Sequence, residues 1–517
     1  MNLIDSFYRA VSPQKALSRE VARVRLDLIK NSGYDESGAS HRKNSLRGWR
    51  PDSRSPQEDI DLNLNTLRQR SRSLYMNAPL ATSAIKTNRT NVIGSGLVLK
   101  PRIDYKTLGM SSSEAEKLNK KIEREFRLWS ESKLCDNNHQ HNFLELQQIA
   151  FMSWLMNGDC FALIRYSETE QPLMPYSLRI KLIEGDKVCN PNSYSDNIDL
   201  ELKNRDNGNS IINGIEVNEN GTVIAYHICN RYLGDINGEK KWTRVEAYGE
   251  ETGNPNILHV FEAERCEQYR GVPFLAPVIE SIKQLTRYTE AEIMAAVING
   301  MFTIFVKTED GEDNVDFEGL DDEDNTEDDT SDVEYKMGNG LINYMKKGES
   351  IEVADPKRPN VNFDGFVNAM SKYIGAALEI PVELLTKNFT ASYSASRAAL
   401  LEAWKAFRTR RSWFSNGFTQ PIYELWLSEA IARGRISAPG FFVDPIIHKA
   451  YCKAEWNGPS QGQLNPVVEV QAAAIRVENG FSTRARETIE LTGGDYETNV
   501  EQLEIENEKM KKIKGDD

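Results

Sequence analysis

The chain contains three groups of residues whose types and spacing could support chemistry, and the first is a possible metal-binding cluster. The stretch CDNNHQH brings Cys135, His139 and His141 together. Thiolates and imidazoles bind zinc, but a closed structural zinc site needs four ligands, and this stretch offers too few. The spacing favours a surface loop between two helices, so no metal site and no cofactor are expected.

The second group is an acidic run at residues 309–334, which contains 15 carboxylates and no lysine or arginine. Its side chains suit calcium, but no glycine falls at the sixth position that an EF-hand loop requires. Because like charges repel one another, the run is expected to form a solvated loop. The acidic clusters leave a metal-dependent DNA-processing nuclease open as an alternative function, although no pair of carboxylates is singled out by its context.

The third group is a basic, aromatic-rich segment, ASYSASRAALLEAWKAFRTRRSWF at residues 391–414, in a chain of formal net charge −14. It carries five basic side chains and one acidic side chain. One sector of its helical wheel mixes apolar and basic side chains, namely Leu400, Leu401, Trp404, Phe407, Arg397, Arg408 and Arg411. A helix at the edge of a monomer shows one clean apolar stripe, so the mixed sector predicts neighbours on several sides.

Three interpretations of the basic segment stay open. Its arginines could pair with carboxylates elsewhere in the chain, line a subunit interface, or grip DNA. One isolated basic helix in an acidic chain is a poor electrostatic footprint for nucleic acid, so the third interpretation is the weakest. The candidate subunit-interface residues are Arg397, Trp404, Arg408 and Arg411.

Composition and missing motifs argue against several classes of protein. With 517 residues, 39% of them hydrophobic and 27% charged, the chain suits a soluble globular protein of roughly two to four domains. No run approaches about 18 uninterrupted apolar residues, and the N-terminal stretch lacks the apolar core of a signal peptide, so a cytoplasmic protein is expected. The six cysteines form no close pair, which indicates reduced thiols. No Walker A loop and no nucleophile elbow occur.

The elements that position these groups begin with helices and continue with strands. The pattern Ser113-x-x-Glu116 predicts a capping box that opens a helix, and a second helix at 143–157 is expected to stop at Gly158. Period-two alternation then predicts strands at 160–166, 176–184, 214–229 and 257–263. Together these patterns predict an α+β fold with an antiparallel sheet.

Two long helical patterns, at 277–298 and 363–380, flank two strand-like segments at 303–308 and 340–353. The acidic run lies between those strands, so the strands are expected to form a small β unit with a charged tip. The longer helix is interrupted by charged residues, which argues against a membrane span.

The C-terminal part of the sequence is mostly helical in pattern. After Gly434 the run APGFFVDP predicts a β-like segment. Further helices follow, with caps expected at Asn465 and at Ser482-Thr483.

Several stretches, distributed over nearly the whole chain, occur in an order typical of one protein family. They are GWRP (48–51), the segments 67–101, 214–228, 259–279, 392–414 and 421–434, and EWNGPSQGQLNP and NGFSTRARE within 455–487. Together they resemble the portal proteins of tailed bacteriophages, in the lambda-like family. Asn465 departs from the family pattern, in which an aspartate before the proline is more usual, and the long acidic insertion is also atypical.

The resemblance implies an α+β, portal-type fold with an antiparallel-sheet wing domain, long stem helices, a small β clip and a C-terminal helical crown. It implies a non-enzymatic ring, typically of twelve subunits, at one capsid vertex, through which double-stranded DNA is packaged and ejected. The implied partners are further copies of the chain, the terminase large subunit, the major capsid and scaffold proteins, and the head-completion and tail proteins. The implied location is the virion, and the host cytoplasm during assembly, with no membrane. A phage structural adaptor that does not pass DNA stays open as an alternative.

By the same resemblance, successive segments of the chain take distinct places in the ring. They are a partly disordered N-terminal arm (1–75), the N-terminal part of the wing (76–270), a stem helix (271–300), the clip with its acidic loop (301–355), a second stem helix (361–381), a tunnel loop (383–396), the C-terminal part of the wing (397–450) and the helical crown (455–517).

The resemblance also suggests two sets of candidate site residues. The candidates at the DNA channel are Lys387, Asn388, Thr390 and Ser392, and Lys387 is the best single candidate for a transient phosphate contact. The candidates for docking the terminase or adaptor proteins are Lys307, Glu309, Asp310, Lys346 and Lys347.

The charge of the chain agrees with a duct that passes DNA rather than holding it. Twelve chains at −14 each would repel phosphates broadly. Tight binding would need many lysine and arginine contacts to phosphates, with release of counterions, and would stall the movement of DNA. No catalytic residue is expected, and the missing P-loop fits a protein whose ATP is hydrolysed by a separate motor.

Overall fold

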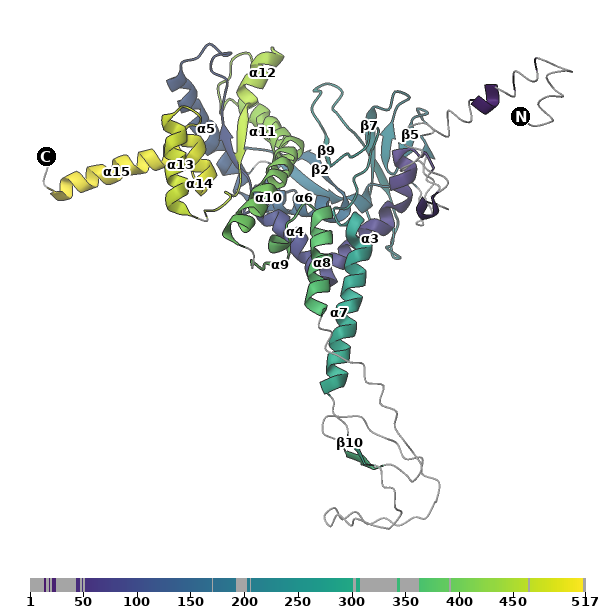
Figure 1. Ribbon diagram of the computed structural model, residues 1–517. Coiled ribbons are helices and arrows are strands. Elements are labelled where there is room, and N and C mark those ends of the chain that lie inside the picture. Colours follow the sequence, from purple (N-terminus) through teal and green to yellow (C-terminus); the bar gives the residue numbers. More distant parts are fainter. Residues whose placement is uncertain are drawn as a thin grey trace, which may run out of the picture. The chain divides into compact units, whose positions relative to one another are not determined.

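The chain divides into two units, Met1–Ser55 and Pro56–Asp517. The computed structural model in Figure 1 describes residues 14, 18, 21–24, 43–46, 49, 52–169, 171–191, 202–204, 206–300, 304–306, 342–344, 362–389, 392–463 and 465–514. The described part of the first unit includes the short helix η2 (Asn44–Leu46), which has no buried residue. All elements from η3 onward belong to the second unit.

The second unit combines helices with several small β-sheets. In chain order its elements are η3 (Gln57–Asp61), α3 (Leu62–Asn77), α4 (Pro79–Val92), β1 (Val98–Pro101), α5 (Ser112–Ser130), η4 (Lys133–Cys135), α6 (Phe143–Asn157), β2 (Asp159–Tyr166), β3 (Leu178–Glu184), η5 (Gly185–Lys187), β4 (Leu202–Lys203), β5 (Ser210–Ile212), β6 (Ile215–Val217), β7 (Val223–Cys229), β8 (Trp242–Glu246), β9 (Ile257–Phe261), η6 (Ala276–Val278), α7 (Ile279–Gly300), β10 (Ile304–Val306), β11 (Ile342–Tyr344), α8 (Phe363–Ala377), α9 (Val382–Thr386), α10 (Tyr393–Phe414), η7 (Ser415–Thr419), α11 (Gln420–Ala432), α12 (Pro445–Cys452), β12 (Ala454–Asn457), α13 (Pro466–Glu478), α14 (Arg484–Thr492) and α15 (Tyr496–Lys514).

The described strands form four sheets. A three-stranded antiparallel sheet has the order β3-β2-β9, and a five-stranded antiparallel meander runs from β4 to β8. The pairs β1–β12 and β10–β11 form two further sheets, antiparallel and parallel respectively. The predicted strands in these regions are confirmed, and so is the α+β fold class.

Strand β2 is buried on both faces along most of its length. Successive side chains of a strand point to opposite faces. Cys160 and Ala162 therefore pack in one hydrophobic cluster with the helices, whereas Phe161 and Leu163 pack in a second cluster with residues of the five-stranded sheet. This strand joins the helical part of the unit to the meander.

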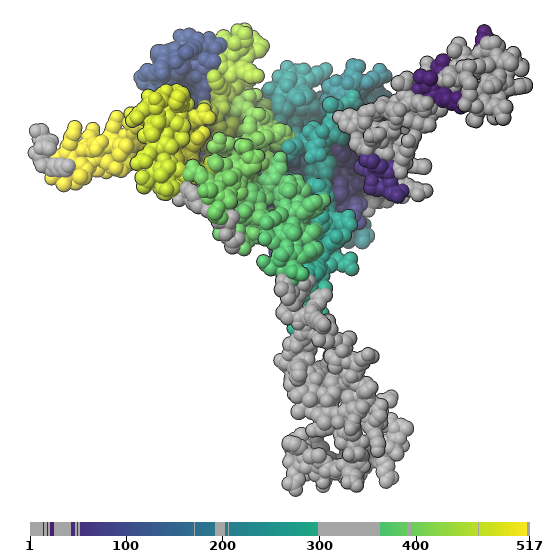
Figure 2. All heavy atoms as spheres, viewed as in Figure 1, coloured from purple at the N-terminus to yellow at the C-terminus, as the bar shows by residue number. Residues whose placement is uncertain are grey.

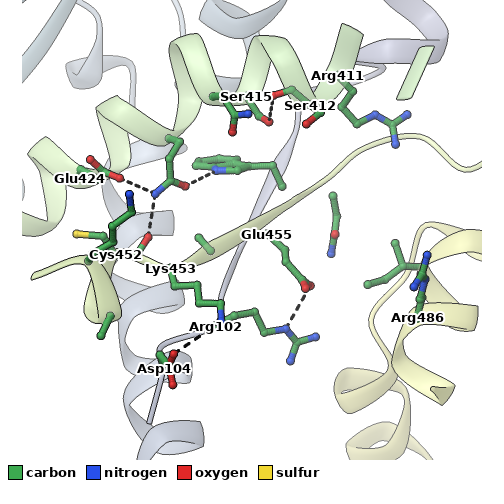
Figure 3. Close-up of a pocket in the computed structure, with 18 of the residues that line it drawn as sticks. Arg102, Asp104, Arg411, Ser412, Ser415, Glu424, Cys452, Lys453, Glu455 and Arg486 are labelled. Atoms are coloured by element: carbon green, nitrogen blue, oxygen red, sulfur yellow. Dashed lines mark hydrogen bonds and ion pairs between the residues drawn. The ribbon is translucent and has the colours of Figure 1, made fainter. Parts of the chain in front are cut away.

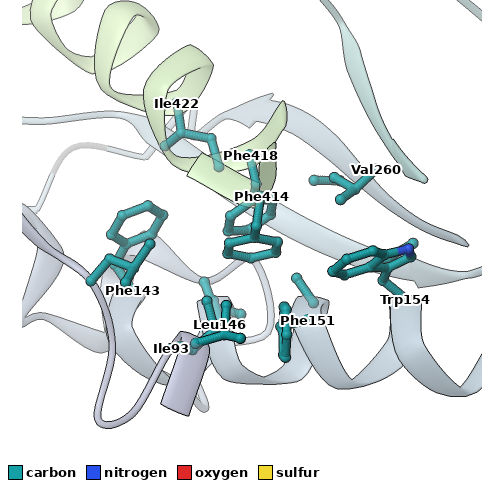
Figure 4. Packing of buried hydrophobic residues seen from close by; sticks show 14 of the residues in the cluster. Ile93, Phe143, Leu146, Phe151, Trp154, Val260, Phe414, Phe418 and Ile422 are labelled. Carbon is teal, nitrogen blue, oxygen red and sulfur yellow. The ribbon is translucent and has the colours of Figure 1, made fainter. Parts of the chain in front are cut away.

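Within the larger hydrophobic cluster, aromatic side chains of α6, α10 and η7 pack against one another (Figure 4). Phe414 stacks on Phe418 with ring centroids 5.2 Å apart, and Phe151 meets the edge of Phe414 at 5.5 Å. Phe143 stacks on Phe418 at 6.1 Å. Such aromatic pairs contribute about 0.5–1.5 kcal/mol each beyond their area burial, so α10 is anchored on α6 by its last turn.

A buried carboxylate, Asp159 at the start of β2, bonds to two buried arginines. Its oxygens accept hydrogen bonds from Arg68 of α3 at 2.9 and 3.0 Å, and from Arg270 at 2.7 and 3.3 Å. Burial acts to raise the pKa of Asp159, but the attraction of Arg270 and Arg68 outweighs it and holds that pKa well below its usual value. The carboxylate is therefore ionised, and it ties α3 and the segment before η6 to β2.

The guanidinium of Arg270 also connects the two larger sheets. It donates to the carbonyl oxygens of Gly185 at 2.8 Å, Val188 at 2.8 Å and Asn213 at 2.5 Å. Gly185 and Val188 follow β3, whereas Asn213 lies between β5 and β6. Because the side chain is 1% exposed, these bonds are shielded from water and hold the loops of both sheets around one charge.

Residues 57–75, which the sequence assigned to an N-terminal arm, form η3 and most of α3 instead. Leu64 and Leu74 are buried, and Arg68 and Ser71 are buried with them. The segment looked like an arm because polar residues occupy positions that face the interior, where Arg68 is paired with Asp159. The boundary of the compact unit is at Ser55/Pro56.

Three local predictions are confirmed and two need correction. Gly158 ends α6 in the left-handed conformation, and Asn465 and Thr483 cap α13 and α14. The capping box of α5 uses Ser111 and Glu114, two residues earlier than predicted, because SSSEAE offers the motif twice. The run APGFFVDP forms turns before α12 rather than a strand.

None of the described helices is both long enough and apolar enough to cross a membrane.

Replacing Asp159 with asparagine is expected to lower the free energy of unfolding by about 3–5 kcal/mol, because it removes the buried carboxylate that bonds to the guanidinium groups of both Arg68 and Arg270. The matched control is Glu239→Gln, which removes a pair with Lys241 whose side chains are 76% and 69% exposed, and is expected to cost less than about 1 kcal/mol. Denaturant-induced unfolding of the purified chains measures both, and equal effects of the two changes would contradict the role given to Asp159.

Candidate functional site

The basic segment singled out in the sequence forms α10, which continues through η7 into α11. Ser392, a candidate channel residue, caps the helix, and its hydroxyl accepts a hydrogen bond from the backbone N–H of Ala395 at 3.4 Å. The apolar side of the helix is buried through Ala403, Trp404 and Phe407. The second half of the helix is thus packed against its own chain.

Two arginines of α10 donate hydrogen bonds to groups of the same chain. Arg410, which is 8% exposed, donates to Glu379 Oε2 at 2.6 Å and to Asn88 Oδ1 at 3.1 Å. Arg411 donates to three backbone carbonyls, those of Asn91 and Val92 at the end of α4 and that of Pro459, at 2.8–2.9 Å. Burial lowers the pKa of Arg411 to about 10.

The other predicted interface residues of α10 lie in different surroundings. Trp404 is 6% exposed and lies under the guanidinium of Arg411, whose central carbon is 5.5 Å from the ring centroid. Arg397 lies 3.8 Å from Glu469 of α13. Arg408 is exposed, and within the described residues its guanidinium has no hydrogen bond or ion pair. Arg408 lines one cavity together with Arg397 and another together with Arg411. The role of these residues at a subunit interface stays a prediction.

The described part of the predicted tunnel loop turns its lysine toward its own chain. Lys387 follows α9 with a φ of 58°, and its ammonium donates to Thr87 Oγ1 of α4 at 2.7 Å. Burial lowers the pKa of Lys387. Lys387, Asn388 and Phe389 are all exposed residues, whereas Thr390 lies outside the described residues.

The predicted docking residues Lys307, Glu309, Asp310, Lys346 and Lys347, and the acidic run 309–334, also lie outside the described residues.

A groove of about 1650 Å³ opens beside α10 (Figure 3). Its walls come from α10, η7, α11, α12, β12 and α14, and Arg486 of α14 lies across the groove from Arg102 and Glu455. The charged side chains that line it are Arg102, Arg408, Arg411, Lys449, Lys453, Arg486, Asp104, Glu424, Glu455 and Glu490. Cations outnumber carboxylates, so the groove is basic in an otherwise acidic chain.

The pairing of these charges leaves part of the positive charge uncompensated. Arg102 lies 3.3 Å from Glu455, and Arg486 lies 3.4 Å from Glu490. Arg408 and Lys449 have no carboxylate partner among the described residues, and Arg411 bonds to carbonyl oxygens instead. Sequence reasoning missed Lys449, because nothing local signals that α12 lines the same groove as α10 and α14.

The possible metal cluster is a surface loop between α5 and α6, as the sequence favoured. Asp136 organises it by accepting hydrogen bonds from the backbone N–H groups of Asn138, Gln140 and His141. Cys135 is buried, and burial raises the pKa of its thiol to about 12. Across the described residues, no group of three or more histidine, cysteine or acidic side chains could hold a metal ion.

Replacing Arg411 with glutamine is expected to destabilise the chain by about 2–4 kcal/mol, because each charge-assisted hydrogen bond contributes about 1.5–3 kcal/mol and the carbonyls of α4 lose their donors. Arg408→Gln, on the same helix, is the matched control and is expected to change stability by less than about 0.5 kcal/mol. Urea-induced unfolding gives both values, and a stable Arg411→Gln variant would contradict the structural role of this arginine.

The chain is similar in sequence to known proteins over most of its length. The model of the family "Phage portal protein, lambda family" matches residues 42–411. The chain is 23% identical over 488 residues to portal protein B of Escherichia phage lambda, which covers 91% of this chain and 88% of that protein. It is 24% identical over 490 residues to the portal protein of Escherichia phage N15, with 91% and 89% covered.

Among solved structures, chains from particles of the gene transfer agent (GTA) are also matched. A chain from the neck of the native GTA particle, with C12 symmetry, has a TM-score of 0.33 and 13% identity, with 81% of this chain and 92% of that chain covered. A chain from the virion of the native particle has a TM-score of 0.35 and 11% identity, with 83% and 92% covered. The family match extends over most of the sequence, and on that ground the chain belongs to the lambda family of phage portal proteins.

Proposed function

We propose that this head–tail connector acts as one subunit of a twelve-membered ring at a single capsid vertex. Double-stranded DNA enters the head through the channel of the ring during packaging and leaves through it during ejection. The single observation that carries the proposal is the match of residues 42–411 to the lambda family of phage portal proteins. Two features of the described structure support it.

The first supporting feature is the pair of helices α7 and α8, which pack against each other and lie side by side (Figure 1). Tyr288 of α7 contacts the rings of Phe363 and Phe366 of α8 at 5.7 and 4.8 Å. Large apolar side chains are nevertheless exposed, namely Ile293 by 64%, Met294 by 59%, Val297 by 47%, Phe366 by 46% and Tyr373 by 67%. Exposed apolar side chains of this kind on α7 and α8 suit contact with further copies of the chain.

The second supporting feature is the small number of arginines that α10 leaves free. Arg410 and Arg411 are bonded within the chain, and Lys387 is turned toward Thr87. A ring of acidic subunits with few free cations at the channel would lower the friction on DNA phosphates. This arrangement favours passage of DNA over tight binding.

The segments take their places in this ring by analogy with the family. Residues 76–270 and 397–450 form the wing, 271–300 and 361–381 the stem, 301–355 the clip, 383–396 the tunnel loop and 455–517 the crown. The clip docks the terminase large subunit and later the head-completion and tail proteins, and the ring contacts the major capsid and scaffold proteins. The ring assembles in the host cytoplasm and remains in the virion.

The ring predicts a particle of about twelve subunits. The purified full-length chain is expected to sediment, at moderate salt, as a species of about twelve times the mass of one chain, because the apolar faces of α7 and α8 need partners. Analytical ultracentrifugation measures this mass directly. A single-subunit mass under all salt conditions, with no ring-shaped particle in electron micrographs, would contradict the proposal.

The proposal also predicts that the protein leaves DNA intact. Incubation with supercoiled plasmid and magnesium or manganese is expected to give no nicked or linear product on an agarose gel. Release of nicked or linear plasmid that disappears with a metal chelator would instead establish the alternative function, a metal-dependent nuclease.

A further inference from the structure

The C-terminal helices α13, α14 and α15 have almost no hydrophobic core of their own. From residue 465 to residue 513, only Ala473 and Glu487 are buried. Figure 2 shows these helices, in yellow, at the surface of the second unit. Tertiary packing supplies most of the stability of helices in proteins, so these helices lack part of the packing that they need. The large apolar side chains that are exposed on them or between them are Val467, Val468, Val470, Ile475, Phe481, Leu503, Ile505, Met510 and Ile513.

Helix α13 exposes its larger apolar residues and turns small and charged residues inward. Its inward side carries Ala473, which is buried, and Glu469, whose side chain is 17% exposed. On its outward side Val467 is 66% exposed, Val470 is 51% exposed and Ile475 is 57% exposed. A surface helix of a single chain normally buries its apolar stripe and exposes its charged residues. The outward side of α13 is therefore the side that is expected to be buried.

The contact between α13 and α10 is incomplete, because a cavity of about 400 Å³ lies between them. Leu400 of α10 and Val468 and Ala472 of α13 line this cavity. Arg397 and Glu469, which also line it, lie 3.8 Å apart. Protein interiors are close-packed, with few voids larger than a water molecule. The chain's own packing against α13 is therefore loose.

We propose that a neighbouring copy of the chain covers the outer face of α13, and that α13 and α14 become firmly ordered only when it does. This outer face consists of Val467, Val468, Val470, Ala474 and Ile475. The inference rests on the proposed ring and adds to it a contact near the C-terminus. Each subunit of a ring meets its two neighbours through two different surfaces, and the outer face of α13 is one of these surfaces.

The chemistry of the outer face favours another copy over other partners. The polar residues on this face are Gln471 and Glu478, and residues 466–475 contain no lysine or arginine. A nucleic-acid backbone is bound through cations, so DNA does not suit this face. Permanent interfaces between subunits are apolar and resemble a protein core cut in half, which is the packing that α13 lacks. A second copy is also present wherever the face itself is made.

The proposal couples the order of α13 and α14 to assembly. Parts of a protein with few buried apolar contacts open at a lower free energy than its core. In a free subunit the two helices open readily, whereas in the ring the neighbouring copy supplies the missing apolar contacts.

A change of charge on the outer face tests the contact. Val467→Asp combined with Val470→Asp is expected to raise the subunit concentration needed for half-maximal assembly by about tenfold or more, because two carboxylates are costly to bury in an apolar contact. Analytical ultracentrifugation of the full-length chain measures this concentration. Both positions are exposed in the single chain, so urea-induced unfolding of the free subunit is expected to stay unchanged.

The matched control places the same charges at exposed apolar residues elsewhere. Leu173 and Ile236 are 90% and 96% exposed, between β2 and β3 and between β7 and β8. Leu173→Asp combined with Ile236→Asp is expected to change the assembly concentration by less than about twofold. Equal effects of the two pairs of changes would overturn the proposal.

Hydrogen exchange of the unaltered full-length chain tests the coupling to assembly separately. The amides of α13 and α14 are expected to exchange about ten times more slowly above the assembly concentration than below it. The amides of α6, most of whose side chains are buried in the single chain, are expected to change little. Equal protection of α13 and α14 in free subunits and in rings would show that the chain's own packing suffices, and would overturn the proposal.

The outcomes distinguish this inference from the proposed ring. If the unaltered chain forms no oligomer at any salt concentration, the proposed function itself fails. If rings form and the variant of Val467 and Val470 assembles at the same concentration as the control, only the contact of α13 is overturned. If α13 is protected only after a different protein is added to the rings, that protein covers the outer face, which also overturns the contact.

Discussion

The ion pair network around Asp159 is the interaction on which the rest of the fold depends. One ionised carboxylate, completely shielded from water, bonds to both Arg68 and Arg270, and Asp186 lies 3.6 Å from Arg68 as a second counter-charge. The guanidinium of Arg270 in turn holds the loops beside β3, β5 and β6. A charge is costly to bury without a partner, so removing Asp159 alone would leave the buried Arg270 without the carboxylate that it bonds to. The network fixes α3 against β2, and with it the junction between the helices and the two larger sheets.

In the basic helix α10, too, arginines are bonded to polar groups of the same chain. An acidic chain retains Arg410 and Arg411 because they satisfy Glu379, Asn88 and the last carbonyls of α4, where apolar side chains could not. These arginines position the aromatic end of the helix on α6. Since they are bonded within the chain, they are poorly placed to grip a polyanion, which is the property that a duct for DNA requires.

Much of the fold could be predicted from the sequence where the determining signal is local. Gly158 needs a left-handed backbone, and the caps at Asn465 and Thr483 satisfy N–H groups within one turn. SSSEAE fits the capping box at two positions, and the pattern alone cannot choose between them.

Contacts between distant residues could not be predicted in this way. Asp159, Arg68 and Arg270 are separated by about a hundred positions, and β1 pairs with β12, which lies near the other end of the chain. The polar residues of α3 suggested an arm because their buried partners belong to other elements. The same limit applies to the groove, whose cations come from α10, α12 and α14. The resemblance to portal proteins, which depends on the order of many weak stretches, was confirmed by the family match.

We infer that the chain acts by geometry, as one subunit of a ring that lets DNA through. End-on projection images of the assembled particle, averaged by electron microscopy, show whether such a ring forms. We expect a ring with an open axial hole at least as wide as a DNA duplex. A particle with a closed centre, or a uniform population of single chains, would contradict it.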